Sequence, residues 1–156
     1  MHANEEMRRV VEEYSSILLR ASYSLLKNRE DAEDAVQETY LRYMEKAPDF
    51  DSLSHEKAWL LRVAINISKN HLASAWFRKR ADLEEDIPAL EPEEKEVLES
   101  VLKLPIKYRT VIHLYYYEGY SLAEIAELLR TPLSTVTTQL SRARKKLALL
   151  LKEDAE

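Results

Sequence analysis

The sequence predicts an all-α protein of two small helical domains joined by an acidic linker, and three observations predict it. The 156 residues include one glycine, Gly119, and no Asn-Gly or Asp-Gly pair, so β-hairpin turns lack their usual residues. Apolar residues recur at helical spacing along most of the chain. Residues 81–100 carry nine acids and one base, whereas residues 1–80 have no net charge. We therefore place the domains at 1–80 and 93–156, with the linker at 81–92.

The composition excludes several classes of function. Without cysteine the chain has no disulfide, thiolate zinc site or cysteine nucleophile, and a single glycine argues against glycine-rich phosphate loops. The four histidines are scattered and no Glu-x-x-His pair occurs, so we predict no metal, no cofactor, no small-molecule substrate and no enzymatic activity. The acidic start and the lack of a long apolar run predict a cytoplasmic protein without membrane insertion.

An amphipathic helix is predicted from Glu30 to Glu45. Its inward face carries Ala32, Ala35, Val36, Thr39, Tyr40 and Tyr43. The opposite face carries Asp34, Gln37, Glu38, Leu41 and Glu45. An exposed leucine among acids suits a contact with another protein better than a contact with DNA. A solvated charged face is an equally good interpretation of these residues alone.

A long helix is predicted from about Ser54 toward Arg80, after a break at 47–54 that contains Pro48. Trp59 is expected in the core. Polar side chains cluster on one side of this helix: Arg62, Asn66, Lys69 and Asn70. Its end reads Trp76-Phe77-Arg78-Lys79-Arg80. Rings beside cations suit single-stranded nucleic acid, although cations at a helix C-terminus also complement the helix dipole.

The acidic segment reads as a linker because Pro88 and Pro92 disfavour a continuous helix through it. Its like charges repel one another and keep it extended. A solvated spacer is the simplest interpretation of residues 81–92.

The C-terminal half begins its pattern with Ser121-Leu-Ala-Glu124, which has the form of a capping box. The helix that it opens is expected to bury Leu122, Ile125, Ala126 and Leu129. Gly119 lies just before it, where a preceding helix needs a left-handed residue to stop. Thr131 and Pro132 predict the next helix start, as N-cap and first helical residue.

The last helix has an apolar stripe and a polar outer side. The stripe comprises Val136, Leu140, Ala143, Leu147 and Leu150. The polar residues are Ser134, Thr135, Thr138, Gln139, Ser141, Arg142, Arg144 and Lys145. Two helices joined by a tight turn, the second one basic, describe a helix-turn-helix that would contact bases near its start and phosphates through its cations. An ordinary helix pair with a solvated face stays open as an alternative.

Motifs in both halves resemble bacterial sigma factors. Asp31-Ala-Glu-Asp34-Ala-Val-Gln37-Glu38 and Trp59-Leu-Leu-Arg62-Val-Ala-Ile-Asn66 resemble region two. Leu104-Pro105-x-x-Tyr108-Arg109, Glu118-Gly119-Tyr-Ser121, Glu124-Ile-Ala126 and Thr135-Val136 through Leu140-Ser-Arg142-Ala-Arg144 resemble region four. The two regions with a short linker are similar to the extracytoplasmic-function group.

The resemblance implies that core RNA polymerase, promoter DNA and an anti-sigma factor are partners. It assigns polymerase docking to Asp34, Gln37, Glu38 and Leu41. It assigns −10 contacts to the loop Phe50–Glu56 and the helix after it, namely Phe50, His55, Arg62, Asn66, Lys69, Asn70, Arg78, Lys79 and Arg80. It assigns −35 contacts to the polar residues of the last helix, and it threads the linker through the polymerase.

Three features differ from the family pattern and two other functions stay open. His55 and Glu56 stand where an aromatic residue is usual, Arg130 replaces a frequent glycine, and 137–139 lacks a cation. At a net charge of −5 we expect the free protein to bind promoters weakly until polymerase delivers both domains together. The alternatives are a stand-alone helix-turn-helix regulator and a sigma-like protein that binds polymerase without directing initiation.

Overall fold

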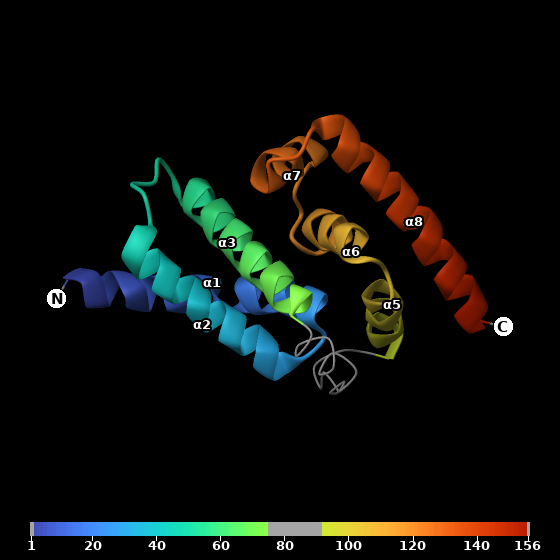
Figure 1. Ribbon diagram of the computed structural model, residues 1–156, viewed down its shortest axis with the longest axis horizontal. Helices are drawn as coiled ribbons and strands as arrows, with labels where there is room; N and C mark the ends of the chain where they lie inside the picture. The colour runs from blue at the N-terminus through green and yellow to red at the C-terminus, as the bar shows by residue number, and fades with distance from the viewer. Residues whose placement is uncertain (1, 75–91, 156) are drawn as a thin grey trace. The chain divides into compact units, whose positions relative to one another are not determined.

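The computed structural model describes residues 2–74 and 92–155, with side chains described over 4–74 and 97–152. Every regular element in these ranges is a helix, which confirms the all-α prediction. The chain divides into two compact units, the N-terminal unit and the C-terminal unit (Figure 1). Residues 81–91 of the predicted linker lie outside the described ranges, so the linker stays a prediction.

The N-terminal unit is a bundle of α1 (His2–Leu26), α2 (Arg29–Lys46) and α3 (Leu53–Ala73), each packed against the other two (Figure 1). Its largest fully enclosed side chains are Val10, Leu18, Leu25, Leu26, Leu60, Leu61 and Ile65. Burying one such side chain contributes roughly 1.5–3 kcal/mol, so this shared apolar core is the main source of the bundle's stability.

Two capping side chains fix where α2 and α3 begin. Asn28 accepts a hydrogen bond from the backbone N–H of Asp31 at 2.9 Å, and Ser52 accepts one from that of His55 at 3.1 Å. Each cap satisfies a backbone donor that the first turn leaves open. The Asn28 cap therefore fixes where the connection between α1 and α2 ends, and the Ser52 cap fixes where the connection between α2 and α3, residues 47–52, ends.

The prediction that α3 continues toward Arg80 is wrong, because the helix ends at Ala73. Ser74 takes an extended conformation with ψ of 132°, which directs the backbone out of the helix. Its N–H bonds to the carbonyl of His71 at 3.1 Å, the tight hydrogen bond of a closing turn. Trp76, Phe77 and the cations Arg78, Lys79 and Arg80 lie outside the described residues.

The C-terminal unit contains α5 (Pro92–Leu102), α6 (Ile106–Ile112), the π-helical turn η1 (His113–Tyr117), α7 (Leu122–Leu129) and α8 (Leu133–Ala155). The long helix α8 packs against α5, α6 and α7 (Figure 1). The core between them includes Val101, Val111, Ile112, Leu114, Ile125 and Val136. Val136, Leu140 and Ala143 of the predicted α8 stripe are buried, while Leu147 and Leu150 are half-buried.

The start of α7 confirms the capping box and the role of the glycine. Ser121 Oγ accepts from the Glu124 N–H at 3.1 Å, and Glu124 Oε1 accepts from the Ser121 N–H at 2.9 Å. Gly119 has φ of 75°, the left-handed region that glycine enters without steric cost. The expected buried face of α7 is only partly right: Ile125 is buried, but Leu122, Ala126 and Leu129 are half-buried, and Leu128 is buried instead.

The turn from α7 to α8 also differs from prediction at its second helix start. Arg130 is left-handed, with φ of 55°, and the Thr131 N–H bonds to the Ala126 carbonyl at 3.0 Å, as in a Schellman motif. Thr131 is not the N-cap, and its hydroxyl donates back to the carbonyl of Leu129 at 3.2 Å. Instead α8 begins at Leu133, one residue later, and the carbonyl before it accepts the first helical hydrogen bond.

Candidate functional site

The outer side of α2 carries two large exposed apolar side chains among polar ones. Asp34 and Gln37 are exposed, and the exposed fractions of Leu41 and Met44 are 54% and 58%. Glu38 is half-buried, and its carboxylate lies 3.1 Å from Nε2 of His71 on α3. We call these five residues the α2 face. The structure thus brings together all four predicted docking residues on one surface.

Met44 is the member of the α2 face that the sequence analysis missed. It lies three residues after Leu41, so both fall on one side of the helix. Leu41 and Met44 are exposed because the opposite side of α2 faces the bundle core, which it fills with Ala32, Ala35, Val36, Thr39 and Tyr43. An apolar residue at this spacing from a predicted contact residue was the signal available in the sequence.

The connection 47–52 is held against the bundle by rings. Phe50 stacks on Tyr43 with ring centroids 6.1 Å apart, and meets the edges of His55 at 5.1 Å and Trp59 at 5.9 Å. Tyr43 and Trp59 also meet edge to face at 6.1 Å. We call these four residues the aromatic cluster. Trp59 is half-buried at this surface rather than fully enclosed in the core.

A depression of about 730 Å³ opens beside the aromatic cluster. The connection 47–52 forms one wall, and the first turns of α1, including Asn4, Glu6 and Met7, contribute another. Tyr43 and Phe50 line it, so apolar ring surface borders open polar space. Such a surface can pack against a planar group with polar edges.

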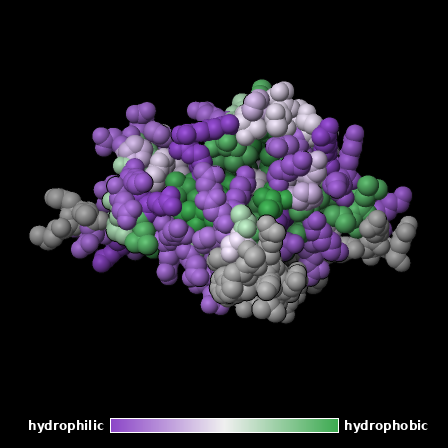
Figure 2. Space-filling view, viewed as in Figure 1, coloured by the Kyte–Doolittle hydropathy of each residue, from purple (hydrophilic) through white to green (hydrophobic). Residues whose placement is uncertain are grey.

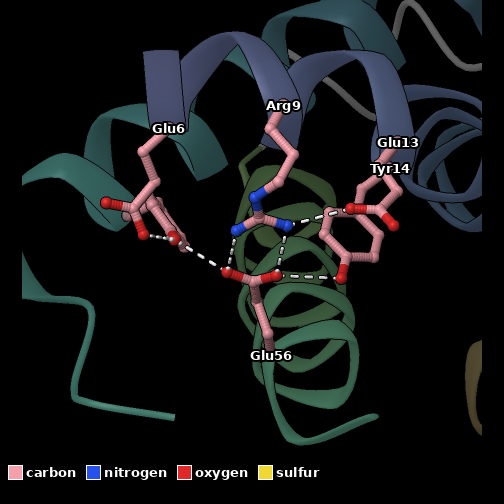
Figure 3. A network of polar contacts seen from close by, with 6 residues as sticks. Glu6, Arg9, Glu13, Tyr14 and Glu56 are labelled. Atoms are coloured by element: carbon pink, nitrogen blue, oxygen red, sulfur yellow. Dashed lines mark hydrogen bonds and ion pairs between the residues drawn. The ribbon is translucent and has the colours of Figure 1, made fainter. Parts of the chain in front are cut away.

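The deepest polar group at this site is the carboxylate of Glu56. Arg9 donates hydrogen bonds to both carboxylate oxygens, from Nη1 to Oε1 at 3.0 Å and from Nη2 to Oε2 at 2.8 Å. The hydroxyl of Tyr14 donates to Oε1 at 2.9 Å and that of Tyr43 donates to Oε2 at 2.8 Å. Figure 3 shows Glu56 rising from α3 to meet Arg9 and Tyr14 on α1. All acceptor sites of the carboxylate are in use.

The placement of Glu56 corrects the prediction that it belongs to the −10 loop. It lies in α3 and only 3% of its surface is exposed, so it is buried structure rather than a base contact. Helical spacing of 56, 60, 64 and 67 continues the buried stripe of α3, and this was the signal in the sequence. Its partners could not be predicted, because Arg9 lies 47 residues away.

The contacts of Glu56 shift the ionisation of the whole group. Hydrogen bonds from Arg9 hold the pKa of Glu56 below its ordinary value, against the opposing effect of burial. The same contact raises the pKa of Arg9. Burial, together with the bond to Glu56, raises the pKa of Tyr14 to about 12 and raises that of Tyr43 as well. Near neutral pH the carboxylate is therefore charged and both phenols are protonated.

The polar side chains of α3 lie on one side of the helix as predicted. Asn66 and Asn70 are exposed, and Arg62 and Lys69 are half-buried. We call these four residues the α3 stripe. Burial lowers the pKa of Lys69 below its ordinary value. The other predicted −10 cations, 78–80, lie outside the described residues, so the stripe is placed only in part.

The outer side of α8 exposes most of its predicted polar residues. Ser134, Thr135, Thr138, Ser141, Arg142 and Lys145 are exposed and Gln139 is half-buried. We call these seven residues the α8 face. Figure 2 shows pale surface over the start of α8, because its serine and threonine residues lie near the middle of the hydropathy scale. The face is therefore rich in hydroxyls at its start and cationic further along.

Arg144 lies apart from the α8 face. Its Nε donates to the hydroxyl of Tyr116 at 2.6 Å, and its guanidinium carbon lies 5.4 Å and 5.6 Å from the ring centres of Tyr115 and Tyr116. At about 100° per residue, Arg144 projects roughly a quarter turn from Lys145. The tyrosines of η1 therefore hold this cation on the flank of the helix.

The turn η1 is closed by a buried pair. His113 Nε2 lies 2.8 Å from Glu118 Oε2, and the imidazole stacks on Tyr117 with centroids 5.4 Å apart. These contacts link the two ends of the π-helical turn. Among the described residues, no cluster of acids and histidines is arranged to hold a metal ion, and no helix is long and apolar enough to cross a membrane.

Comparison with known proteins identifies both units. Residues 10–78 match the family described as Sigma-70 region 2, and residues 94–147 match Sigma-70, region 4. The chain is 30% identical to the ECF RNA polymerase sigma factor SigW of Bacillus subtilis, over 92% of this chain and 88% of that protein. It is 31% identical to the ECF RNA polymerase sigma factor SigL of Mycobacterium tuberculosis, over 94% and 89%.

Solved structures agree with this assignment. The sigma factor RpoE of Bartonella quintana, in complex with the anti-sigma factor NepR, aligns over 95% of this chain and 98% of its own with a TM-score of 0.77 and 23% identity. CnrH, in complex with the cytosolic domain of CnrY, aligns over 97% and 90% with a TM-score of 0.72 and 27% identity. The chain belongs to the sigma-70 family, as a member of the extracytoplasmic-function group of sigma factors that direct transcription initiation.

Proposed function

We propose that this sigma factor docks on core RNA polymerase through the α2 face, contacts the promoter −10 element through Phe50, His55 and the α3 stripe, and reads the −35 element through the α8 face. It acts in the cytoplasm as a binding protein rather than as an enzyme. Arg144 contributes to the −35 contact from the flank of α8. The acidic residues of 81–92 thread through the polymerase as a charged strap.

The observation that carries this proposal is the pair Leu41 and Met44 on the α2 face. More than half of the surface of each side chain is exposed, whereas the opposite side of α2 is packed in the bundle core. Contiguous exposed apolar surface with a polar rim is typical of a protein contact, and its burial would drive association. The acids beside it suit a basic partner surface, because complementary charge favours encounter.

Titration of labelled protein with core polymerase tests the docking surface. Leu41→Ala or Met44→Ala should each weaken binding about tenfold, since truncating a central interface side chain costs on the order of 1–2 kcal/mol. Val11→Ala is the matched control, because Val11 is an apolar side chain on α1 with 40% of its surface exposed. Equal binding by all three variants would remove the α2 face from the interface.

Run-off transcription with purified core polymerase tests the initiation function. The sigma factor and core polymerase together should start transcripts at one class of promoter, and neither component should do so alone. A protein that binds polymerase without starting transcripts would fit the sigma-like alternative. A protein that binds a palindromic duplex as a dimer without polymerase would fit the stand-alone regulator.

We also propose an anti-sigma factor as a regulatory partner. The family resemblance supports this partner, and the exposed α2 face offers a surface that it could cover in competition with polymerase. The test is inhibition of run-off transcription by the purified product of a gene adjacent to that of the sigma factor. Inhibition that excess core polymerase relieves is the expected result, and undisturbed transcription would count against this partner.

A further inference from the structure

We propose that Tyr43 and Glu56 are positioning residues that hold Phe50 in place for its contact with the −10 element. Neither residue touches DNA in this account. The inference rests on the proposed function of Phe50, and it assigns to the buried polar group a role in promoter opening beyond its contribution to stability.

Glu56 fixes the orientation of the Tyr43 ring through a hydrogen bond from its hydroxyl. The Tyr43 hydroxyl lies 2.8 Å from Oε2 of Glu56 and 3.3 Å from Oε1 of Glu6. A phenol has one proton to donate, and the shorter contact to a buried carboxylate is the stronger hydrogen bond. Arg9 in turn holds that carboxylate at two points, so the acceptor cannot easily rotate away.

The second step is that Tyr43 supports Phe50. Their rings are nearly parallel, with an interplanar angle of 20°, so Tyr43 presents its face to Phe50. Trp59 contacts both rings in edge-to-face geometry and completes the support. The connection 47–52 belongs to no helix, and the position of Phe50 depends on these side-chain contacts. A change in the orientation of Tyr43 is therefore passed directly to Phe50.

The third step separates positioning from stability. Tyr14 donates to the same carboxylate at 2.9 Å, but it comes from α1 and is not a member of the aromatic cluster. Tyr14→Phe and Tyr43→Phe thus each remove one hydroxyl from the same buried acceptor. They match in the bond that is lost and differ in whether the affected ring supports Phe50. Equal effects on stability with unequal effects on promoter opening would identify positioning.

The experiment uses holoenzyme formed with saturating sigma factor on a promoter from which it initiates. Permanganate reactivity of −10 thymines measures opening, and thermal unfolding followed by circular dichroism measures stability. Tyr43→Phe should lower opening about fivefold, the effect expected for one lost hydrogen bond, and Tyr14→Phe should stay close to the parent protein. The two variants should lower the melting temperature alike. A template that is already unpaired at −10 should restore transcription by Tyr43→Phe.

A double variant decides whether Tyr43 acts through Phe50. If it does, Tyr43→Phe causes no further loss in a Phe50→Ala background, because coupled residues are not additive. Glu56→Gln provides a second variant that keeps the side-chain size, and it should lower opening in the same coupled manner. Additive losses, or equal opening by the Tyr14 and Tyr43 variants, would overturn the inference.

The Phe50→Ala arm distinguishes failure of the inference from failure of the proposed function. Unchanged opening by Phe50→Ala would mean that Phe50 does not contact the −10 element, and both proposals would fall together. A loss with Phe50→Ala but none with Tyr43→Phe would keep the contact and reject only the positioning role.

Discussion

At the scale of single residues, Glu56 joins all three helices of the N-terminal unit. It lies on α3, while its donors lie on α1 and α2. Removing one partner of a buried charge-assisted contact is costly, because the remaining groups lose their hydrogen bonds away from water. The side chain is therefore a sensitive point at which to test the bundle.

Glu56→Gln should destabilise the protein by about 2–3 kcal/mol near neutral pH, because the amide removes the charge and one acceptor. Contact with Arg9 lowers the pKa of Glu56 in the folded protein. The stabilisation is therefore complete above the pKa that Glu56 has in the unfolded chain, and it is lost as pH falls through the lower pKa that Glu56 has in the folded protein. Urea unfolding of both proteins between neutral and acidic pH should show their stability difference shrinking toward low pH. A difference independent of pH would contradict this account.

Arg130→Gly should stabilise the C-terminal unit by about 0.5–1 kcal/mol, because a left-handed conformation costs an L-residue about 1–2 kcal/mol. Arg130 has φ of 55°. Gly119→Ala is the opposite control: φ is 75° and an added Cβ would meet nothing within 4 Å, so its expected loss comes from the backbone alone. Thermal unfolding measures both changes, and a lower melting temperature for Arg130→Gly would be the contrary result.

At the scale of elements, the three cations of α8 predicted to contact DNA fall into two groups. All three are exposed, but Arg142 and Lys145 lie on the α8 face, whereas Arg144 lies on the flank against Tyr115 and Tyr116. Spacing along a helix predicts the first group. The position of Arg144 depends on the π-helical turn η1, which no residue pattern in the sequence predicts. It also depends on the contact with Tyr116, which lies 28 residues away along the chain.

Arg142→Ala and Lys145→Ala should each reduce the salt dependence of promoter binding by holoenzyme by about one unit of log–log slope, because each removes a phosphate contact. Arg144→Ala should have a smaller effect, since Tyr116 holds its guanidinium aside. Lys152→Ala is the control for loss of one exposed positive charge elsewhere on α8. Binding to a promoter duplex over a salt series measures the slopes, and an equal change with Lys152→Ala would remove the contact assignments.

The helices themselves were predictable to different degrees for physical reasons. The capping box at Ser121 and the glycine stop at Gly119 act within a few residues, so sequence order is enough to identify them. The end of α3 at Ala73 was missed because the polar and aromatic residues after it remain compatible with a helix. The helix α8 starts one residue later than predicted, and the Thr131 hydroxyl bonds to the neighbouring Leu129 carbonyl rather than capping the helix.

At the scale of the whole molecule, charge and fold give different information. The chain has a net charge of −5, yet residues 128–152 contain cations and no acids. The motifs of both units were sufficient for the family, and family membership is confirmed. The Glu56 group was not predictable, because its members lie on separate helices that meet only in the folded bundle.

The free protein should bind promoter duplex weakly, and the holoenzyme should bind it selectively. Phosphate attraction supplies most nonspecific affinity and the net charge opposes it, whereas polymerase joins two weak contacts into one strong contact. Fluorescence anisotropy with and without core polymerase measures the difference. Tight, selective binding by the free protein would favour the stand-alone regulator.

The arrangement of Glu56 limits how hybrid sigma factors can be built. Grafting α3 alone from this protein into a relative would transfer Glu56 without Arg9 and the two tyrosines that bind it. Grafting α1 alone would transfer Arg9 without its carboxylate partner. Functional chimaeras should therefore exchange the first three helices as one cassette. Crossover points placed after Ser74 preserve the group, while those placed between α1 and α3 divide it.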